Sequence, residues 1–328
     1  MSSKFAAAAT QPAALAAASE LALRGNAVDA VCAGVLAAAA EDPSVLFGPL
    51  HVLVTGPGFG VRCIDGRLRQ PGLGAPRPRG FVDDDEIPDA ARVAIPALPA
   101  AVATAISMFG TVTAKRAFAP ALEALERKHP RRALLAALAD RGPPALAADP
   151  FADALVAVAG RLAHGLVTRD DLRAPRAPAV ACESRDGVAV APFADEHERA
   201  DGCHVVCAAD HRGGLAVACY EVVADGLAIE ALGVVAPLRA RPVMRGERRV
   251  DPGAPLPCAS TVALLDPRGD DRFDVAAGVA GDRARARMKK LFAAVTSGAS
   301  LETALRDHAP SAGALQTGRA PKAYSFTP

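Results

Sequence analysis

Residues 204–223 read HVVCAADHRGGLAVACYEVV, and this stretch indicates the fold class. It contains two apolar, β-prone runs, 204–210 and 215–223, and the HRGG between them supplies the glycines of a hairpin turn. Neither run alternates polar with apolar residues, which is typical of a sheet that is covered on both faces. Two further apolar runs, STVALLD (260–266) and FDVAAGV (273–279), predict two more strands.

Helical patterns flank these strands at both ends of the chain. Residues 11–24 predict a helix that ends at Gly25, and Asn26 is a candidate N-cap for an alanine-rich helix over 27–40. LHVLVT (50–55) and VRCID (61–65) predict a further strand pair, with GPGFG as its turn. Helices are also expected over much of 99–164, with a break near Gly142, and over 282–295 and 299–307. Strands enclosed by helices in this order predict a layered α/β sandwich.

Composition excludes several classes of function. The formal net charge of +1 gives no strong field for nucleic acid or an acidic membrane. No apolar run reaches 18 residues, so we expect no membrane span. Seven cysteines, an odd number, do not suggest a disulfide framework, which favours the cytoplasm. The chain shows neither an internal repeat nor a low-complexity linker, and we expect one domain over residues 1–328.

One segment carries a specific family likeness. Residues 9–48 contain Gly-Asn-Ala-Val-Asp-Ala (25–30), then an apolar helix pattern and Glu41-Asp42-Pro43. This segment resembles the opening of the γ-glutamyltranspeptidases, and IDGRLRQP (64–71), VAIPALPAAVATAISMFG (93–110) and GLVTRDDL (165–172) are similar to later elements of that family. The resemblance implies a four-layer αββα sandwich of the N-terminal-nucleophile hydrolase type. It also implies an acyltransferase or amidohydrolase that acts on a small amide or γ-glutamyl-type substrate without a cofactor or a metal.

The second half of the chain aligns with the family's nucleophile strand. Placed on that pattern without gaps, Cys203 falls on the nucleophile, Asp210 on its Asp and Gly213 on its Gly. The family cleaves itself directly before the nucleophile. The resemblance therefore implies cleavage between Gly202 and Cys203, and a heterodimer of fragments 1–202 and 203–328.

The chemistry of Cys203 is coherent with this role. A thiol at a new N-terminus can use the freed α-amine as its base, and the ordinary pKa of that amine is about 7.7–8.0. The alternative interpretation is a small buried cysteine without chemistry. A metal site at Cys203, His204 and Cys207 is excluded by strand geometry. The His side chain points to the opposite face, and the two cysteines lie about 13 Å apart.

The remaining site residues come from the same resemblance. Arg67 matches the arginine that holds the substrate's carboxylate, although a solvated loop arginine is the alternative. The oxyanion hole would use the backbone N–H groups of Ala280 and Gly281. Pro257-Cys258 replaces the family's Ser-Ser pair, which makes Cys258 a candidate substrate-binding residue.

Other departures keep three hypotheses open. Glu221 and Val223 stand where the family has the Thr and Asn that assist the nucleophile. The chain is therefore a self-processed amidohydrolase or acyltransferase, a degenerate and unprocessed protein that binds a ligand or a partner protein, or a biosynthetic enzyme that uses other residues of the pocket. A dinucleotide site at GPGFG is excluded, because the third glycine and the following helix are missing.

Overall fold

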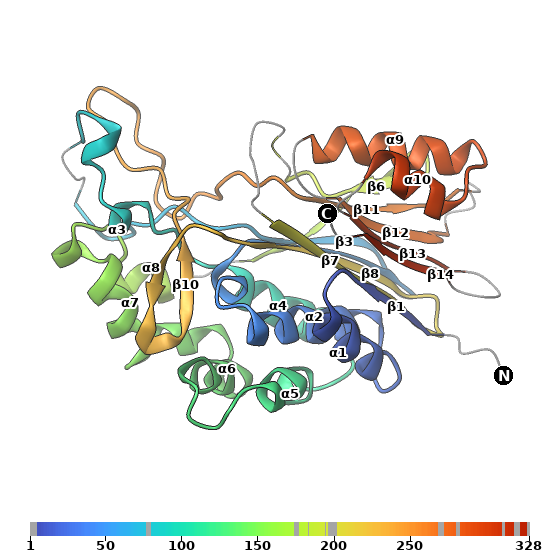
Figure 1. The fold of residues 1–328 in the computed structure, drawn as a ribbon, viewed down its shortest axis with the longest axis horizontal. Helices are drawn as coiled ribbons and strands as arrows, with labels where there is room; N and C mark the ends of the chain where they lie inside the picture. The colour runs from blue at the N-terminus through green and yellow to red at the C-terminus, as the bar shows by residue number, and fades with distance from the viewer. Residues whose placement is uncertain are drawn as a thin grey trace.

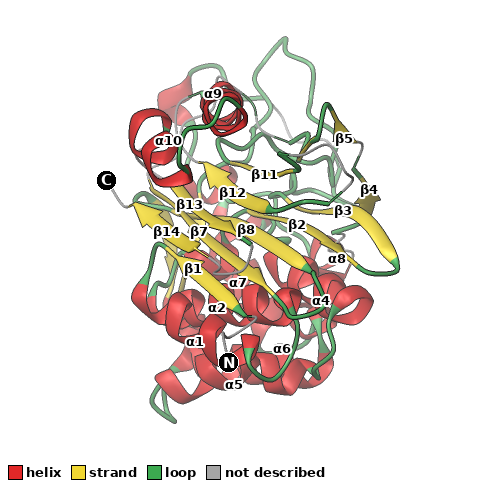
Figure 2. Ribbon diagram, turned by 90° about the vertical axis from the view of Figure 1, so that its right-hand side faces the viewer, coloured by secondary structure: helices red, strands yellow, loops and turns green. Residues whose placement is uncertain are grey.

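Two stacked antiparallel sheets form the centre of the structure, and helices cover both of their outer faces (Figure 1). The computed structural model describes residues 5–76, 80–173, 177–182, 184–193, 195, 202–267, 272–279, 283–309, 312–317 and 322–326. The layers are seen edge-on in Figure 2, with the strands between two groups of helices. The predicted αββα sandwich is confirmed.

The first sheet contains both strands of the 204–223 stretch. Its strand order is β1 (Ala6–Ala9), β7 (Gly202–Ala209), β8 (Leu215–Val222), β2 (Leu50–Gly56), β3 (Phe59–Gly66) and β4 (Ala179–Ala181). GPGFG forms the turn between β2 and β3, with Gly58 at a φ of 88°, and a strand follows it. The predicted hairpin at 204–223 is also confirmed, because β7 and β8 pair directly.

The second sheet lies against the first. Its order is β14 (Lys322–Phe326), β13 (Ala312–Gln316), β12 (Val275–Val279), β11 (Thr261–Leu265), β6 (Val188–Val190) and β5 (Ser184–Arg185). Apolar side chains of both sheets, among them Val205, Val217 and Leu264, fill the space between them. Cys203 is partly buried and packs against this inter-sheet layer.

Helices bury the outer face of each sheet. The first sheet is covered by helices that include α1 (Pro12–Ala22), α2 (Ala27–Glu41), α4 (Leu98–Phe109), α5 (Ala114–Ala124) and α6 (Pro130–Arg141). The second is covered by α9 (Ala284–Thr296) and α10 (Leu301–His308). Shorter helices α3 (Asp89–Arg92), α7 (Phe151–Ala159) and α8 (Arg169–Arg173) lie toward one end. Within the described residues, no helix is long and apolar enough to cross a membrane.

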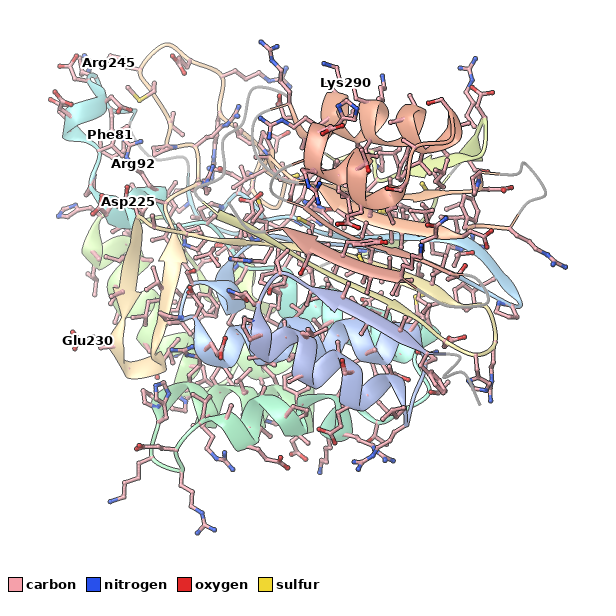
Figure 3. The ribbon with its side chains drawn as sticks, turned by 45° about the vertical axis from the view of Figure 1, so that its right-hand side comes forward. Phe81, Arg92, Asp225, Glu230, Arg245 and Lys290 are labelled. Carbon is pink, nitrogen blue, oxygen red and sulfur yellow. The ribbon has the colours of Figure 1, made fainter. Side chains whose placement is uncertain are left out.

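A separate hairpin lies beside the helices at that end. It pairs β9 (Gly226–Ile229) with β10 (Val234–Pro237), and Glu230 marks its tip in Figure 3. Beyond it, the Phe81 N–H donates to the Val243 carbonyl at 2.9 Å, and the Arg245 N–H donates to the Phe81 carbonyl at 2.7 Å. These bonds join two segments that are far apart in sequence.

The start of α2 explains the glycine, the asparagine and the aspartate of the Gly-Asn-Ala-Val-Asp-Ala motif. The Asn26 side chain accepts from the Asp29 N–H at 3.0 Å, and the Asp29 carboxylate accepts from the Asn26 N–H at 2.9 Å. This capping box satisfies donors that a helix start leaves free. A Cβ at Gly25 would lie 2.6 Å from Asp29 Oδ2, so glycine is needed there for the close approach.

Facing β7, two glycines let the sheets come close together. A Cβ at Gly278 of β12 would lie 2.6 Å and 2.7 Å from the two methyl groups of Val205. A Cβ at Gly313 of β13 would lie 3.0 Å from Val205 Cβ. Val205 is two residues from Cys203, and its packing therefore fixes the depth at which β7 lies.

We expect Gly278→Ala to lower the free energy of unfolding by about 2 kcal/mol, because the new methyl group overlaps a β-branched side chain that is stiff in a strand. Val205→Ala in the same chain should recover part of the loss, with a coupling of about 1 kcal/mol or more between the two sites. Urea unfolding measures both effects. Gly60→Ala is the control, because its Cβ would meet only Arg62 Nη1, at 3.6 Å. Purely additive losses would contradict the overlap.

Candidate active site

Cys203 is the second residue of β7, and its side chain belongs to the inter-sheet layer. Cys207, four residues later on the same face, is buried more deeply in that layer. His204 faces the opposite side of the sheet, where its Nδ1 lies 3.0 Å from Thr10 Oγ1 and its ring lies against Tyr220. Cys203 and His204 therefore point to opposite faces, as the strand geometry requires.

Three acidic or thiol groups surround the Cys203 side chain. Glu221 lies directly opposite it in the ladder between β7 and β8. The hydrogen bond with Cys219, burial, and the charges of Cys219, Glu221 and Cys258 raise the pKa of the Cys203 thiol well above its ordinary value. The thiol is thus protonated at neutral pH in the intact chain, and a reaction there needs a base.

Glu221 is a buried carboxylate, with only 3% of its side-chain surface exposed. Its Oε1 accepts from the Ala259 N–H and from the Ser260 hydroxyl, each at 3.3 Å. Its Oε2 lies 3.9 Å from Arg239 Nη2. Buried carboxylates are costly unless they are hydrogen-bonded or paired, and these partners meet that condition.

Arg67 lies on the same side of the first sheet and is held by Asp65. Its Nε and Nη2 donate to the two carboxylate oxygens of Asp65 at 2.9 Å and 3.0 Å. Its guanidinium carbon lies 4.6 Å from the centre of the Phe193 ring. Burial favours the neutral form of Asp65, but the hydrogen bond from Arg67 and the charges of Arg69 and Arg67 outweigh it and lower the pKa of Asp65.

Cys258 is the neighbour that Cys203 and Arg67 share. Its thiol donates to the Phe193 carbonyl at 3.2 Å, and its side chain is buried. Burial and the Glu221 charge raise the pKa of the Cys258 thiol, and the Arg67 charge opposes them. Cys258 also contributes to the raised pKa of Cys203. The structure therefore brings these three predicted residues into one cluster.

The other predicted site residues have different outcomes. Gly202 opens β7 and pairs with Val222, so the bond predicted to be cleaved lies inside the ladder. Ala280 and Gly281 lie outside the described residues. Within the described residues, no group of three His, Cys, Asp or Glu side chains has the geometry of a metal site.

His51 is a residue that the sequence analysis did not single out. It lies between Cys219 and Asp65 in the first sheet and packs against Phe193, with ring centres 5.5 Å apart. It is completely buried, and neither ring nitrogen has a hydrogen-bond partner among the described residues. Burial lowers the pKa of His51 to about 4. The sequence does contain a hint of this residue, because His51 is the one histidine within the apolar run LHVLVT.

A cavity of about 450 Å³ lies elsewhere, in the helical layer. Its walls come from α4, the loop after it, α5, α6 and the turn after α6, and include Ile106, Val112, Phe118 and Leu138. The side chains that line it contain no titratable group. It is therefore separate from the polar cluster around Cys203.

Solved structures share this architecture over nearly the whole chain. A cephalosporin acylase from Bacillus halodurans superimposes with a TM-score of 0.72 at 14% sequence identity, over 93% of this chain and 83% of that chain. The shared fold is the four-layer αββα sandwich. Two structures of LmbA2991 have TM-scores of 0.64 and 0.63, each at 14% identity over 93% of this chain and 84% of the other.

The remaining comparisons give a partial structural match and no sequence match. A γ-glutamyltranspeptidase from Helicobacter pylori has a TM-score of 0.43 at 16% identity, over 53% of this chain and 64% of that chain. No protein-family model and no curated protein matches the sequence. At these identities the likenesses establish the fold and leave the activity to be argued from the site.

Proposed function

We propose that this protein is an N-terminal-nucleophile amidohydrolase or acyltransferase that acts on a small amide, including γ-glutamyl-type amides. The observation that carries the proposal is the position of Cys203. It is the second residue of an inner strand of the first sheet, and its thiol enters the inter-sheet layer beside a cluster of buried polar groups. A nucleophile in an αββα sandwich needs that combination of strand start and polar surroundings.

The proposed reaction uses the α-amine that cleavage before Cys203 releases. The amine takes the proton of the Cys203 thiol, and the sulfur attacks the substrate's amide carbonyl. The C–N bond then breaks, the leaving amine takes that proton, and a thioester remains on Cys203. Water completes a hydrolysis, or a second amine completes a transfer. The backbone N–H groups of Ala280 and Gly281 are the proposed oxyanion donors.

Substrate binding is assigned to Arg67 and Cys258. Asp65 engages Nε and Nη2 of Arg67, so a substrate carboxylate would bind through Nη1. Cys258 would line the space between Arg67 and the nucleophile. We further propose a single domain made of fragments 1–202 and 203–328. All seven cysteines are free, which fits a reducing compartment such as the cytoplasm.

A second candidate function is binding without catalysis, in an unprocessed chain. Two observations favour it: the raised pKa of the Cys203 thiol and the engagement of Arg67 by Asp65. In such a cluster the thiol keeps its proton and the arginine is already paired with a carboxylate of the same chain. The two candidates differ in whether the chain is cut, which makes the covalent state of the protein the deciding measurement.

Mass spectrometry of the purified protein is expected to show two fragments, 1–202 and 203–328, whose summed mass exceeds that of the intact chain by one water. Cys203→Ala should stay in one piece, because no thiol is left to attack the Gly202 carbonyl. Cys203→Ser should still cleave, since a hydroxyl supports the same chemistry. The matched control is Cys207→Ala, on the same strand and face, which should cleave normally. A wild-type chain that stays intact for days, with a Cys203 that resists alkylation, would contradict the enzyme and favour the unprocessed protein instead.

A further inference from the structure

Glu221 occupies the closest cross-strand position to Cys203. In an antiparallel ladder, directly opposite residues alternate between hydrogen-bonded pairs and non-hydrogen-bonded pairs, and the latter bring side chains closer together. The Glu221 N–H donates away from β7, to the Pro49 carbonyl at 3.4 Å. On the other strand, the backbone of Val205 bonds Thr10 on the β1 side, at 3.0 Å in both directions. Cys203 and Glu221 therefore form a non-hydrogen-bonded pair, with Cβ atoms about 4.5–5.5 Å apart.

The Glu221 carboxylate is fixed in this position from the opposite side. Ala259 and Ser260 both donate to Oε1, which anchors the carboxylate to the segment before β11. Burial keeps solvent from screening its charge. A carboxylate that is held rigidly at this place can stabilise a positive charge that forms beside Cys203.

Several other charged or titratable groups lie near the pair, and the charge of Arg67 acts on Cys258. Cys219 of β8 and Cys258 of the loop before β11 face Cys203, and both are thiols. Arg239 faces Glu221 from the segment after β10. From the β1 side Thr10 binds His204, on the opposite face of the sheet. Among the described residues, Glu221 is the carboxyl group whose charge acts on the Cys203 thiol.

We propose that Glu221 is a positioning residue for the α-amine that processing creates on Cys203. The Glu221 carboxylate stabilises the protonated amine beside the thiol and so strengthens it as the base. This inference rests on the proposed function, because the amine exists only after cleavage. In each turnover the proton moves from Cys203 Sγ to the α-nitrogen and then to the leaving amine, and Glu221 itself neither gives nor takes a proton.

This arrangement suits a thiol nucleophile. An α-amine has an ordinary pKa of about 7.7–8.0, and a free thiol has one of about 8.5. An adjacent negative charge raises the pKa of an amine. The pKa of the Cys203 thiol is raised above its ordinary value, so the amine that accepts its proton must be a stronger base than an ordinary α-amine. A hydroxyl-bearing residue at position 221 would supply no such charge.

The test measures the pKa of the Cys203 α-amine in the processed protein, without any substrate. The amine is acylated with acetic anhydride at a series of pH values, and its labelling is followed by mass spectrometry of the fragment that starts at Cys203. In the wild type we expect a pKa above about 8. Glu221→Gln keeps an acceptor oxygen for Ala259 and Ser260 but removes the charge, and it should lower the pKa of the amine by about one unit or more. Glu221→Asp should restore most of the shift.

The control is Glu230→Gln, at the exposed tip of the β9–β10 hairpin (Figure 3), which should leave the amine unchanged. A processed wild type whose α-amine titrates at or below its ordinary value would overturn the inference and leave the proposed function standing. So would a Glu221→Gln variant with an unchanged pKa. A variant that folds but no longer cleaves also overturns it, because Glu221 would then act in the cleavage step. A wild type that never cleaves removes the proposed function itself.

Discussion

Asp29→Ala is expected to lower the free energy of unfolding by about 4 kcal/mol, because it leaves several part-buried donors without their acceptor. The Asp29 carboxylate is completely buried. It accepts from the Asn26 N–H at 2.9 Å and from the Thr111 hydroxyl at 2.7 Å. The Thr111 N–H lies 3.0 Å from Oδ2, and the Val112 N–H lies 3.4 Å from Oδ1. One side chain therefore joins the start of α2 to the chain between α4 and α5.

Urea unfolding followed by circular dichroism measures this loss. Asp29→Asn should lie between the wild type and Asp29→Ala, because an amide keeps one acceptor oxygen and brings two donors that lack partners. The control is Asp89→Ala, which removes an exposed aspartate from the first turn of α3. It should cost less than about 1 kcal/mol. An Asp29→Ala loss no larger than that of the control would show that the loop does not depend on this carboxylate.

Two of the motifs that carry the family resemblance, Gly-Asn-Ala-Val-Asp-Ala and GLVTRDDL, have structural roles in this chain. Asn26 and Asp29 form the capping box of α2. Asp171, from the GLVTRDDL element, accepts from the backbone N–H groups of Gly72, Leu73 and Thr168. These side chains satisfy backbone donors and do not face Cys203. That explains why the motifs predicted the fold well and say less about the activity.

The strands that the sequence analysis did not predict are short or rich in alanine. β1 consists of four alanines, whose intrinsic preference is helical. It becomes a strand because it pairs with β7, so that Ala6 lies opposite Ala209. β13 and β14 likewise depend on pairing with each other and with β12. Such strands are determined by distant partners, which local propensity does not contain.

The candidate site was predictable in part. Cys203 and Arg67 came from the resemblance, and the structure places both beside Cys258. The environment of Glu221 was not predictable, because its partners Ala259 and Ser260 lie 38 and 39 residues away. Asp65 is only two residues from Arg67, but the sequence does not show that its carboxylate occupies the guanidinium.

The second large effect concerns the pH dependence of stability, and it depends on His51. Burial lowers the pKa of His51 to about 4 in the folded state, whereas an unfolded chain gives histidine about 6.5. Between these values the unfolded state binds more protons than the folded state, so stability rises with pH there. The contribution is fully present above about pH 6.5 and is lost as the pH falls through about 4. The difference amounts to about 3 kcal/mol.

His51→Leu should remove this dependence, because leucine fills a similar space and carries no proton. We expect the variant to be at least as stable as the wild type at neutral pH, since two buried nitrogens without partners disappear. Below about pH 6 the wild type should lose stability faster than the variant. His204, whose pKa burial also lowers, is present in both proteins and cancels in the difference. The measurement is urea unfolding at several pH values, with exposed His211→Leu as the control. Parallel curves for the wild type and His51→Leu would mean that the imidazole is hydrated or paired, and that the interior next to Cys219 and Asp65 admits a proton.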